Sequence, residues 1–168
     1  RKQRAMEKQS VLSRPRASTA VVASPQTIAV QFDERKLVEF AWARAAHTGM
    51  AVVAFVMGTS YTDVALNWVA AISKAGVHRH FLLALDESCV ALLHRGNATV
   101  YAGVTVPQTA QFEGKKKLLQ VLWWRRWQAM HVMVQAGLTV VHSDLDVIWL
   151  RDPLAFLSNI HGAIISSH

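Results

Sequence analysis

The chain has 168 residues, of which 52% are hydrophobic and 17% charged, and its formal net charge is +7. This length accommodates one ordinary domain, and the composition excludes a wholly disordered protein, because disorder requires low hydrophobicity and high charge. The single cysteine, Cys89, excludes an intrachain disulfide framework and a multi-cysteine zinc site. The longest apolar run, residues 50–57, is too short to span a bilayer, which takes about 18 residues.

Most of the positive charge lies at the start of the sequence. Residues 1–16 hold six of the 18 basic residues and one acid, so they contribute +5 and residues 17–168 carry only +2. We therefore predict no nucleic-acid partner, because the body of the protein is not strongly basic. We expect residues 1–32 to form a basic, flexible leader or linker and residues 33–168 to form the folded domain.

Predicted helices and strands alternate along that domain. A helix is expected over residues 33–47, with Asp33 as its N-cap and Gly49 as its stop, and a second helix begins at Thr62 or Asp63. In chain order we predict strand 50–57, helix 62–74, strand 80–85, helix 86–93, strand 99–106, helix 115–136 and strand 138–141, followed by short strands at 147–150 and 163–166.

This alternation with short connections predicts an α/β fold, Rossmann-type, with a mostly parallel sheet and flanking helices. Strands 50–57 and 80–85 are apolar throughout, which is typical of strands buried on both faces. Ligands of such sheets bind at the carboxyl ends of the strands. The polar residues predicted there are Thr59, Ser60, Asp86 and residues 143–146.

The strongest chemical signal is the pair Asp144 and Asp146, separated by Leu145, after a buried strand. In an extended segment, residues i and i+2 point to the same face, so the two carboxylates would lie side by side. Such a pair is costly unless a cation lies between them. Mg²⁺ and Mn²⁺ take oxygen ligands, often one or two carboxylates plus substrate phosphates. The simpler interpretation is that Asp144 caps a turn and Asp146 is solvated.

Two chemistries use paired aspartates after a strand. In phosphohydrolases of the haloacid-dehalogenase type Asp144 would be the nucleophile, and in sugar-nucleotide glycosyltransferases the aspartates hold a metal on the donor diphosphate. In the phosphohydrolase pattern, the strand with the aspartate pair is the first element of the domain, and Thr or Val stands where this chain has Ile148. Here the pair lies late in the chain, which favours the glycosyltransferase pattern.

Residues 140–153, VVHSDLDVIWLRDP, resemble the hallmark of the nucleotide-diphospho-sugar transferase domain of glycosyltransferase family 77, which includes plant and algal arabinosyl- and xylosyltransferases. Asn67-Trp68, residues 75–77 and residues 81–86 are similar to an earlier block of that domain. The resemblance runs from about residue 50 to residue 168. It implies a GT-A fold truncated at its C-terminus, with residues 33–168 as its nucleotide-sugar-binding part.

The resemblance also implies a UDP- or GDP-sugar donor, a glycan or glycoprotein acceptor, a divalent metal (Mn²⁺ or Mg²⁺), and retention of anomeric configuration. It assigns Asp144 and Asp146 to the metal, with Asp146 favoured as the direct ligand, and Leu145 to the donor site. Thr59 and Ser60 would line the nucleoside pocket, and Asp86 would reach the base or ribose. A Golgi lumenal location is expected, with any membrane anchor outside the given sequence.

Two features of the helix over residues 115–136 have competing interpretations. The simplest interpretation of the basic residues is a solvated helix face formed by Lys115–Lys117, Arg125 and Arg126. Alternatively, Arg126 stabilises the departing diphosphate, because it occupies the place where the family has a Lys two residues after a Trp. Trp123, Trp124 and Trp127 are expected to pack on the sheet, with sugar stacking as the alternative.

The last alternative is non-enzymatic. Only 22 residues follow Asp146, and the sequence begins with Arg1 rather than Met, so we expect a fragment or processed chain that lacks the acceptor site and later catalytic groups. An inactive, truncated nucleotide-binding fragment is therefore a third hypothesis beside the transferase and the phosphohydrolase.

Overall fold

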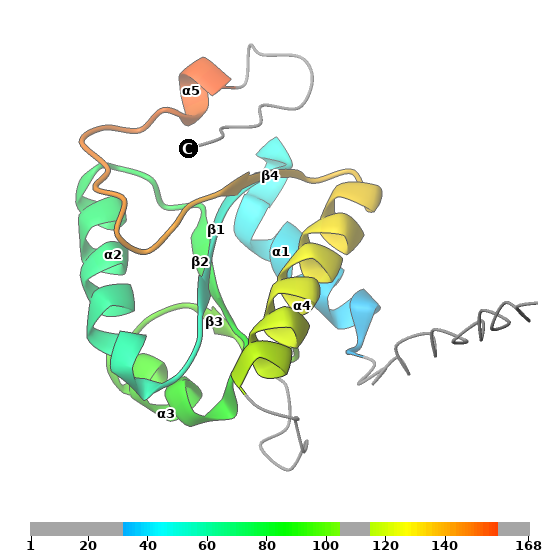
Figure 1. The fold of residues 1–168 in the computed structure, drawn as a ribbon. Helices are drawn as coiled ribbons and strands as arrows, with labels where there is room; N and C mark the ends of the chain where they lie inside the picture. The colour runs from blue at the N-terminus through cyan, green and yellow to red at the C-terminus, as the bar shows by residue number, and fades with distance from the viewer. Residues whose placement is uncertain (1–31, 105–114, 158–168) are drawn as a thin grey trace, which may run out of the picture.

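The computed structural model describes residues 32–104 and 115–157, which contain one four-stranded sheet. Every neighbouring pair of strands is parallel, and the strand order is β3-β2-β1-β4 (Figure 1). The strands are Met50–Val56 (β1), His80–Ala84 (β2), Val100–Tyr101 (β3) and Thr139–His142 (β4). The predicted fold class, a GT-A-like α/β sheet with flanking helices, is confirmed.

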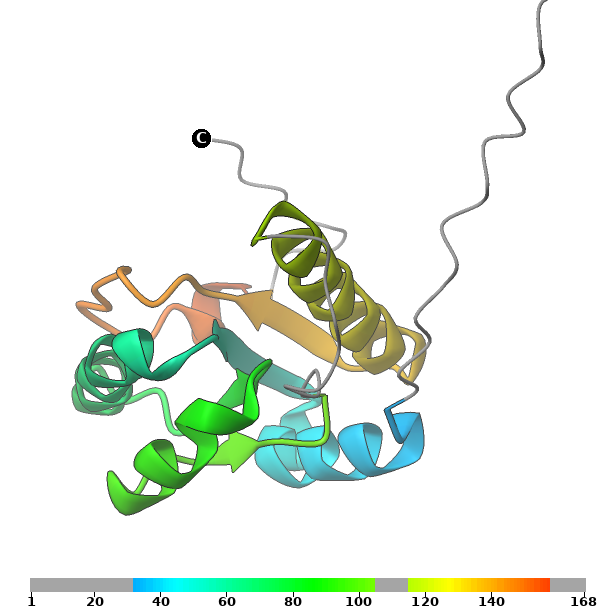
Figure 2. The ribbon, with the colours of Figure 1, turned by 60° about the horizontal axis from the view of Figure 1, so that its bottom comes forward.

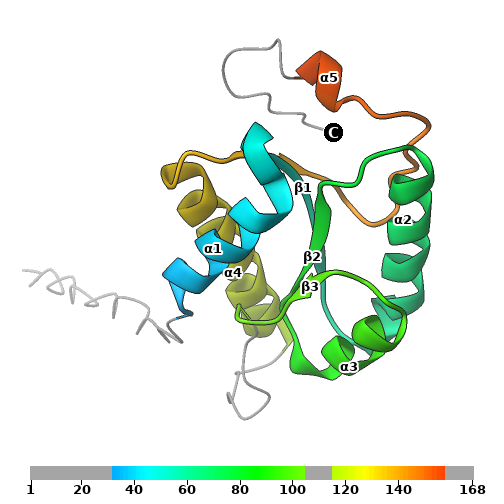
Figure 3. The ribbon, with the colours of Figure 1, turned by 180° about the vertical axis from the view of Figure 1, so that it is seen from behind.

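Helices cover both faces of this sheet. Figures 1 and 3 show α1 and α4 on one side and α2 and α3 on the other. The helices are Glu34–Ala45 (α1), Thr62–Lys74 (α2), Glu87–Arg95 (α3), Lys115–Gln135 (α4) and Leu154–Leu157 (α5), with 3-10 turns Ala46–Thr48 (η1) and Thr59–Tyr61 (η2). Within the described ranges, no helix is long and apolar enough to cross a membrane.

The helix ends follow local capping chemistry, with one exception. Asp33 caps α1, because its Oδ1 accepts a hydrogen bond from the Lys36 amide at 3.1 Å. Gly49 follows η1 with φ 66°, a left-handed conformation that glycine adopts without strain. The predicted cap of α2 is wrong: η2 runs directly into the helix, so Tyr61 is its N-cap and Thr62 lies buried in the first turn.

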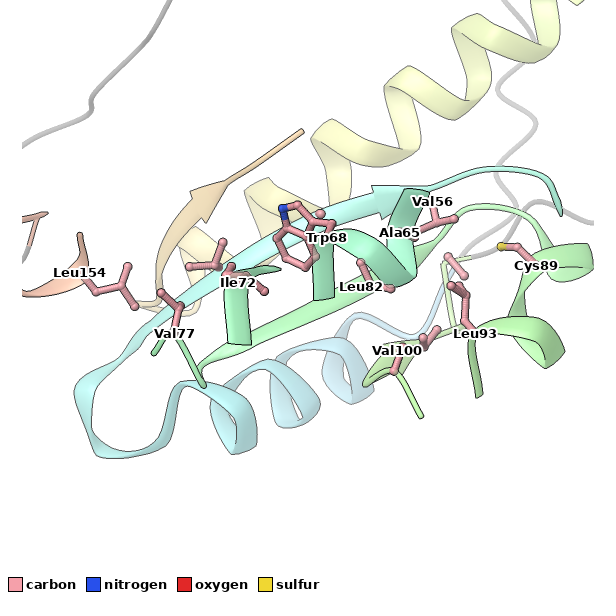
Figure 4. Close-up of a cluster of buried hydrophobic side chains, with 14 of the residues drawn as sticks. Val56, Ala65, Trp68, Ile72, Val77, Leu82, Cys89, Leu93, Val100 and Leu154 are labelled. Atoms are coloured by element: carbon pink, nitrogen blue, oxygen red, sulfur yellow. The ribbon is translucent and has the colours of Figure 1, made fainter. Parts of the chain in front are cut away.

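The alternation of side chains along β1 divides the core into two clusters. Ala51, Val53 and Phe55 face α1 and α4, whereas Val52, Ala54 and Val56 face α2 and α3. Because helices cover both faces, β1 has no polar position, which explains its uninterrupted apolar sequence. Figure 4 shows the cluster on the side of α2 and α3, where Trp68, Ile72 and Leu82 pack together.

The chain after β4 does not form the short strand predicted over residues 147–150. It leaves the sheet and passes beside α2 (orange in Figures 1 and 2), because Trp149 hydrogen-bonds back to Ser143 and Leu154 inserts into the α2-side core. In the strand predicted over residues 99–106, only Val100–Tyr101 is paired among the described residues. Of the leader predicted over residues 1–32, only Phe32 is described, and it packs into the core on the side of α1 and α4. Residues 1–31 and the strand predicted at 163–166 lie outside the described ranges.

We expect Leu154→Ala to lower the free energy of unfolding by about 2–4 kcal/mol, because it opens a cavity at a side chain that is only 1% exposed. Leu150→Ala is the matched control: the same substitution in the same segment, at a side chain that is 90% exposed, should change stability by less than about 0.5 kcal/mol. Urea unfolding of both variants measures the difference. Equal stability losses would show that α5 is not anchored in the core.

Candidate functional site

The carboxyl ends of the parallel strands gather the predicted polar residues at one edge of the sheet. Thr59 and Ser60 follow β1, Asp86 follows β2, and residues 143–146 follow β4. The ends are not level: His142, the last residue of β4, pairs with Val53, whereas β1 continues to Val56. The chain therefore leaves β4 beside the middle of β1, and Phe55 borders the site.

Alternation along β4 sorts the next residues onto opposite sides of the sheet. The His142 ring lies 5.4 Å from the Phe55 ring, and Asp144 Oδ1 lies 3.9 Å from Arg126 Nη1 of α4, so both residues face α4. Ser143 faces the other way, where its Oγ accepts a hydrogen bond from Trp68 of α2. The residues that share a face are therefore His142 and Asp144.

The segment carrying the two aspartates is a turn. The Val147 amide donates to the Asp144 carbonyl at 3.3 Å, and Leu145 and Asp146 are the central residues. The extended conformation predicted for residues 144–146, with side-by-side carboxylates, is thus wrong, because the strand ends at His142. Both aspartates are exposed, so their carboxylates can reach a ligand from solvent. The Leu145 side chain packs against the α2-side core.

Arg126 lies between Asp144 and a group of aromatic rings. Its guanidinium carbon is 4.4 Å from the centroid of the Trp123 ring, 5.6 Å from that of Trp127 and 5.8 Å from that of Phe55. The side chain is 19% exposed, and its Nε is buried without a hydrogen-bond partner in the part of the chain that the structure describes. The predicted solvated position for Arg126 is wrong, and the aromatic rings instead hold the guanidinium beside Asp144.

His142 is a site residue that the sequence-based assignment left out. Its Nε2 lies 3.7 Å from Asp144 Oδ1. Burial lowers the His142 pKa below its usual value, and the Arg126 charge lowers it further, whereas the Asp144 carboxylate acts in the opposite direction. The ring is therefore neutral at pH 7 and offers a lone pair or an N–H beside Asp144. Its position two residues before Asp144 in a strand was the available signal.

The three other predicted residues have less direct links to the aspartates. Thr59 and Ser60 are exposed in η2. Asp86 is the N-cap of α3, because its Oδ1 accepts from the Ser88 amide at 2.7 Å. Among the described residues, none of these three side chains hydrogen-bonds to or pairs with Asp144. The structure thus brings Arg126 to Asp144 and leaves Thr59, Ser60 and Asp86 on neighbouring strand ends.

The tryptophans of α4 do not pack on the sheet as predicted. Trp123, Trp124 and Trp127 are 55%, 62% and 55% exposed, respectively. The inward stripe of α4 instead consists of Leu122, Arg125, Ala129 and Met133. Because residues 123, 124 and 127 point elsewhere around the helix, the three indoles form an apolar surface on α4.

Arg125, on the same helix, is buried rather than solvated. It was predicted on a solvated face, but it is 4% exposed and its guanidinium lies over the Phe32 ring at 5.3 Å. Burial lowers the pKa of Arg125. It lies on the inward stripe of α4, whereas the next residue, Arg126, faces Asp144. The side chains of Lys115–Lys117 lie outside what the structure describes.

The donor set around the turn suits a hard divalent cation that shares its coordination with a ligand. Within residues 32–104 and 115–157, no group of three or more His, Cys, Asp or Glu side chains could enclose a metal ion. Two exposed carboxylates are what Mg²⁺ or Mn²⁺ commonly takes from a protein when phosphate oxygens and water complete its shell. The residues present therefore fit a metal bound jointly with a phosphate ester.

Comparison with known proteins identifies the family of this chain. Residues 75–167, more than half of the chain, match the family model described as nucleotide-diphospho-sugar transferase. The chain is similar to the beta-arabinofuranosyltransferase RAY1 of Arabidopsis thaliana, at 25% identity over 120 residues, which cover 69% of this chain and 22% of that protein. The chain thus spans about a fifth of the length of this relative. No solved structure matches it.

Proposed function

Because the chain belongs to the nucleotide-diphospho-sugar transferase family, we propose that it is a metal-dependent glycosyltransferase that moves a sugar from a UDP- or GDP-sugar to a glycan or glycoprotein. Residues 140–153 support placement in glycosyltransferase family 77, and with it retention of anomeric configuration and a Golgi lumenal location. The name of the arabinofuranosyltransferase relative supports a glycosyl group as the transferred group. The observation that carries the proposal is the meeting of Asp144, His142 and Arg126 at the end of β4.

In this proposal Asp144 and Asp146 hold Mn²⁺ or Mg²⁺, with Asp146 as the direct ligand. When bound, such a cation supplies Lewis-acid stabilisation of the negative charge on the departing diphosphate. The turn presents both carboxylates to solvent within three residues of chain, so both can supply oxygen ligands to a cation. His142 Nε2 lies 3.7 Å from Asp144 Oδ1, so the ring borders the carboxylate that would hold the cation.

Arg126 is positioned to bind the diphosphate of the donor. A guanidinium forms paired hydrogen bonds with phosphate oxygens, and contact with three aromatic rings fixes its plane. Its 3.9 Å separation from Asp144 leaves it close enough to contact a phosphate that shares the metal. Arg126 would thus neutralise part of the charge that appears when the sugar leaves.

The remaining residues would surround the nucleoside and the diphosphate. Leu145 would contribute through its backbone, because its side chain packs into the core. The exposed hydroxyls of Thr59 and Ser60 lie after the central strand β1, where they can donate hydrogen bonds to a nucleoside. Asp86 follows the adjacent strand β2 and would contact the base or ribose while it caps α3.

Calorimetric titration with UDP, with and without Mn²⁺, tests this function. We expect UDP to bind in the presence of Mn²⁺, and Arg126→Ala to weaken that binding about 10- to 100-fold, as expected for loss of a charge-assisted hydrogen bond. Arg151→Ala is the matched control, because Arg151 is exposed and lies beyond the turn. A wild-type protein that binds neither UDP nor GDP with Mn²⁺ or Mg²⁺ would contradict the proposal, and equal effects of the two variants would remove Arg126 from the site.

A further inference from the structure

Ser143 is the centre of a buried hydrogen-bond network directly beside the aspartate turn. The side chain is 4% exposed. Its Oγ accepts from Trp68 Nε1 at 3.0 Å and from Trp149 Nε1 at 3.1 Å, and donates to the Asp144 carbonyl at 3.0 Å. A serine hydroxyl has one donor and two acceptor lone pairs, so all of its hydrogen-bonding capacity is used. We call Ser143, Trp68 and Trp149 the indole clamp.

The clamp joins α2 to the two ends of the aspartate turn: Trp68 is 75 residues from Ser143 in the sequence, whereas Trp149 is six residues from it. Trp68 comes from α2 (Figure 4). Its side chain is 2% exposed and meets the His80 ring edge-on, with 5.7 Å between the ring centroids. Ser143 lies at the end of β4, and its amide donates to the Val53 carbonyl at 3.0 Å. Trp149 comes from the segment after the turn. Hydrogen bonds with the sheet and with α2 therefore fix Ser143, and the Ser143 hydroxyl fixes Trp149 by accepting a hydrogen bond from its indole N–H.

The clamp acts on the turn through one atom. The Asp144 carbonyl oxygen accepts from both Ser143 Oγ and the Val147 amide, and the second of these bonds closes the turn. The direction of this carbonyl fixes the peptide plane between Asp144 and Leu145. Both metal-binding carboxylates of the proposed function lie on residues of this turn, so a change in that plane would displace one relative to the other.

We propose that Ser143, held by the two indoles, is a positioning residue that sets the geometry of the turn and thereby its affinity for a divalent cation. The effect on cation affinity rests on the proposed function, whereas the effect of Ser143 on the conformation of the turn does not. Partners that orient metal ligands typically change affinity about 10- to 100-fold when removed. Ser143 does not contact the metal in this scheme and acts through the Asp144 backbone.

Two substitutions separate the clamp from general packing. Ser143→Ala removes the hydroxyl and leaves two buried indole N–H groups without their acceptor. Trp149→Phe keeps an aromatic ring and removes one donor, so it tests the clamp if Ser143→Ala fails to fold. Trp124→Phe is the matched control, because it is the same substitution at an indole that is 62% exposed on α4.

The experiment measures Mn²⁺ affinity in the presence of UDP by electron paramagnetic resonance, and amide hydrogen exchange of the metal-free protein by NMR. We expect Ser143→Ala to weaken Mn²⁺ binding about 10-fold or more, Trp149→Phe to weaken it less, and Trp124→Phe to leave it unchanged. The Val147 amide, which bonds to the Asp144 carbonyl, should exchange faster in the two clamp variants. The Leu82 amide, which bonds to the Thr99 carbonyl in the sheet, should not change.

The two readouts distinguish failure of this inference from failure of the proposed function. If the wild type binds Mn²⁺ and the clamp variants bind it equally well, the inference is overturned. If the wild type takes up no Mn²⁺ even in the presence of UDP, the metal-dependent function fails, and exchange of the Val147 amide alone tests the inference. Faster exchange there, with an unchanged Leu82 amide, would still support a positioning role for Ser143, and unchanged exchange would overturn it.

Discussion

Replacement of Asp146 by alanine is expected to lower Mn²⁺-dependent release of UDP from a UDP-sugar by about a hundredfold or more, with little change in stability. The large effect follows from loss of the proposed direct metal ligand, which stabilises charge in the transition state. The small stability effect follows from exposure: Asp146 lies in the middle of a surface turn, where substitutions usually cost less than about 0.5 kcal/mol.

The control for this prediction is Asp63→Ala, the same substitution at an exposed residue in the first turn of α2. Both variants would be assayed for UDP release across a Mn²⁺ series, and for thermal stability. Unchanged metal-dependent turnover in Asp146→Ala would rule out the assigned role of this residue. A wild type that binds UDP and Mn²⁺ but releases no UDP would instead agree with an inactive nucleotide-binding fragment.

The largest stability effect is expected at Trp68. Trp68→Ala should lower the free energy of unfolding by about 3–5 kcal/mol, the range for truncating a large buried aromatic side chain. The indole is 2% exposed, packs in the α2-side core, and donates to the buried Ser143 hydroxyl, so the variant loses packing and a hydrogen bond together.

Trp124→Ala provides the comparison, because it removes the same atoms from an indole that is 62% exposed. It should change stability by less than about 0.5 kcal/mol. Urea unfolding followed by circular dichroism measures both variants without relying on tryptophan fluorescence. Similar losses at Trp68 and Trp124 would mean that the indole surface of α4 is as important for packing as the core.

The parts of the fold that could be predicted are those in which local chemistry and burial agree. The apolar run over β1 predicted a strand buried on both faces, and helices on both faces of the sheet account for it. Asp33 and Asp86 have side chains that accept from nearby amides, so the starts of α1 and α3 follow from local sequence. The order of strands in the sheet came from the structure alone.

The helix α4 shows where periodicity fails. Apolar and aromatic residues occur all around it, so spacing alone does not decide whether Leu122 or Trp123 faces inward. The structure places Leu122 in the core and leaves Trp123 more than half exposed. Arg125 and Arg126 are adjacent, yet one lies over Phe32 and the other beside Asp144, which composition cannot distinguish.

The rule for strand ends pointed to residues 143–146, which do follow β4 in the structure, but the geometry of this segment depends on where β4 ends. Because β4 ends at His142, the alternation of side chains brings His142 and Asp144 to the same face, and the turn that follows ends it before Asp146. The indole clamp was not predictable in the same way, because Trp68 and Ser143 are 75 residues apart in the sequence. Only the folded structure brings those two side chains together.

The segment from Ser143 to Leu154 is tethered at both ends, since the first is held by the sheet and α2 and the second is buried in the core. A chain segment closed between two fixed points samples far fewer conformations than a free loop of the same length. The turn with both aspartates lies inside this segment, so much of its conformational entropy is lost when the protein folds. A cation or donor bound there as proposed would meet a preorganised turn, and a smaller entropic cost would oppose its binding.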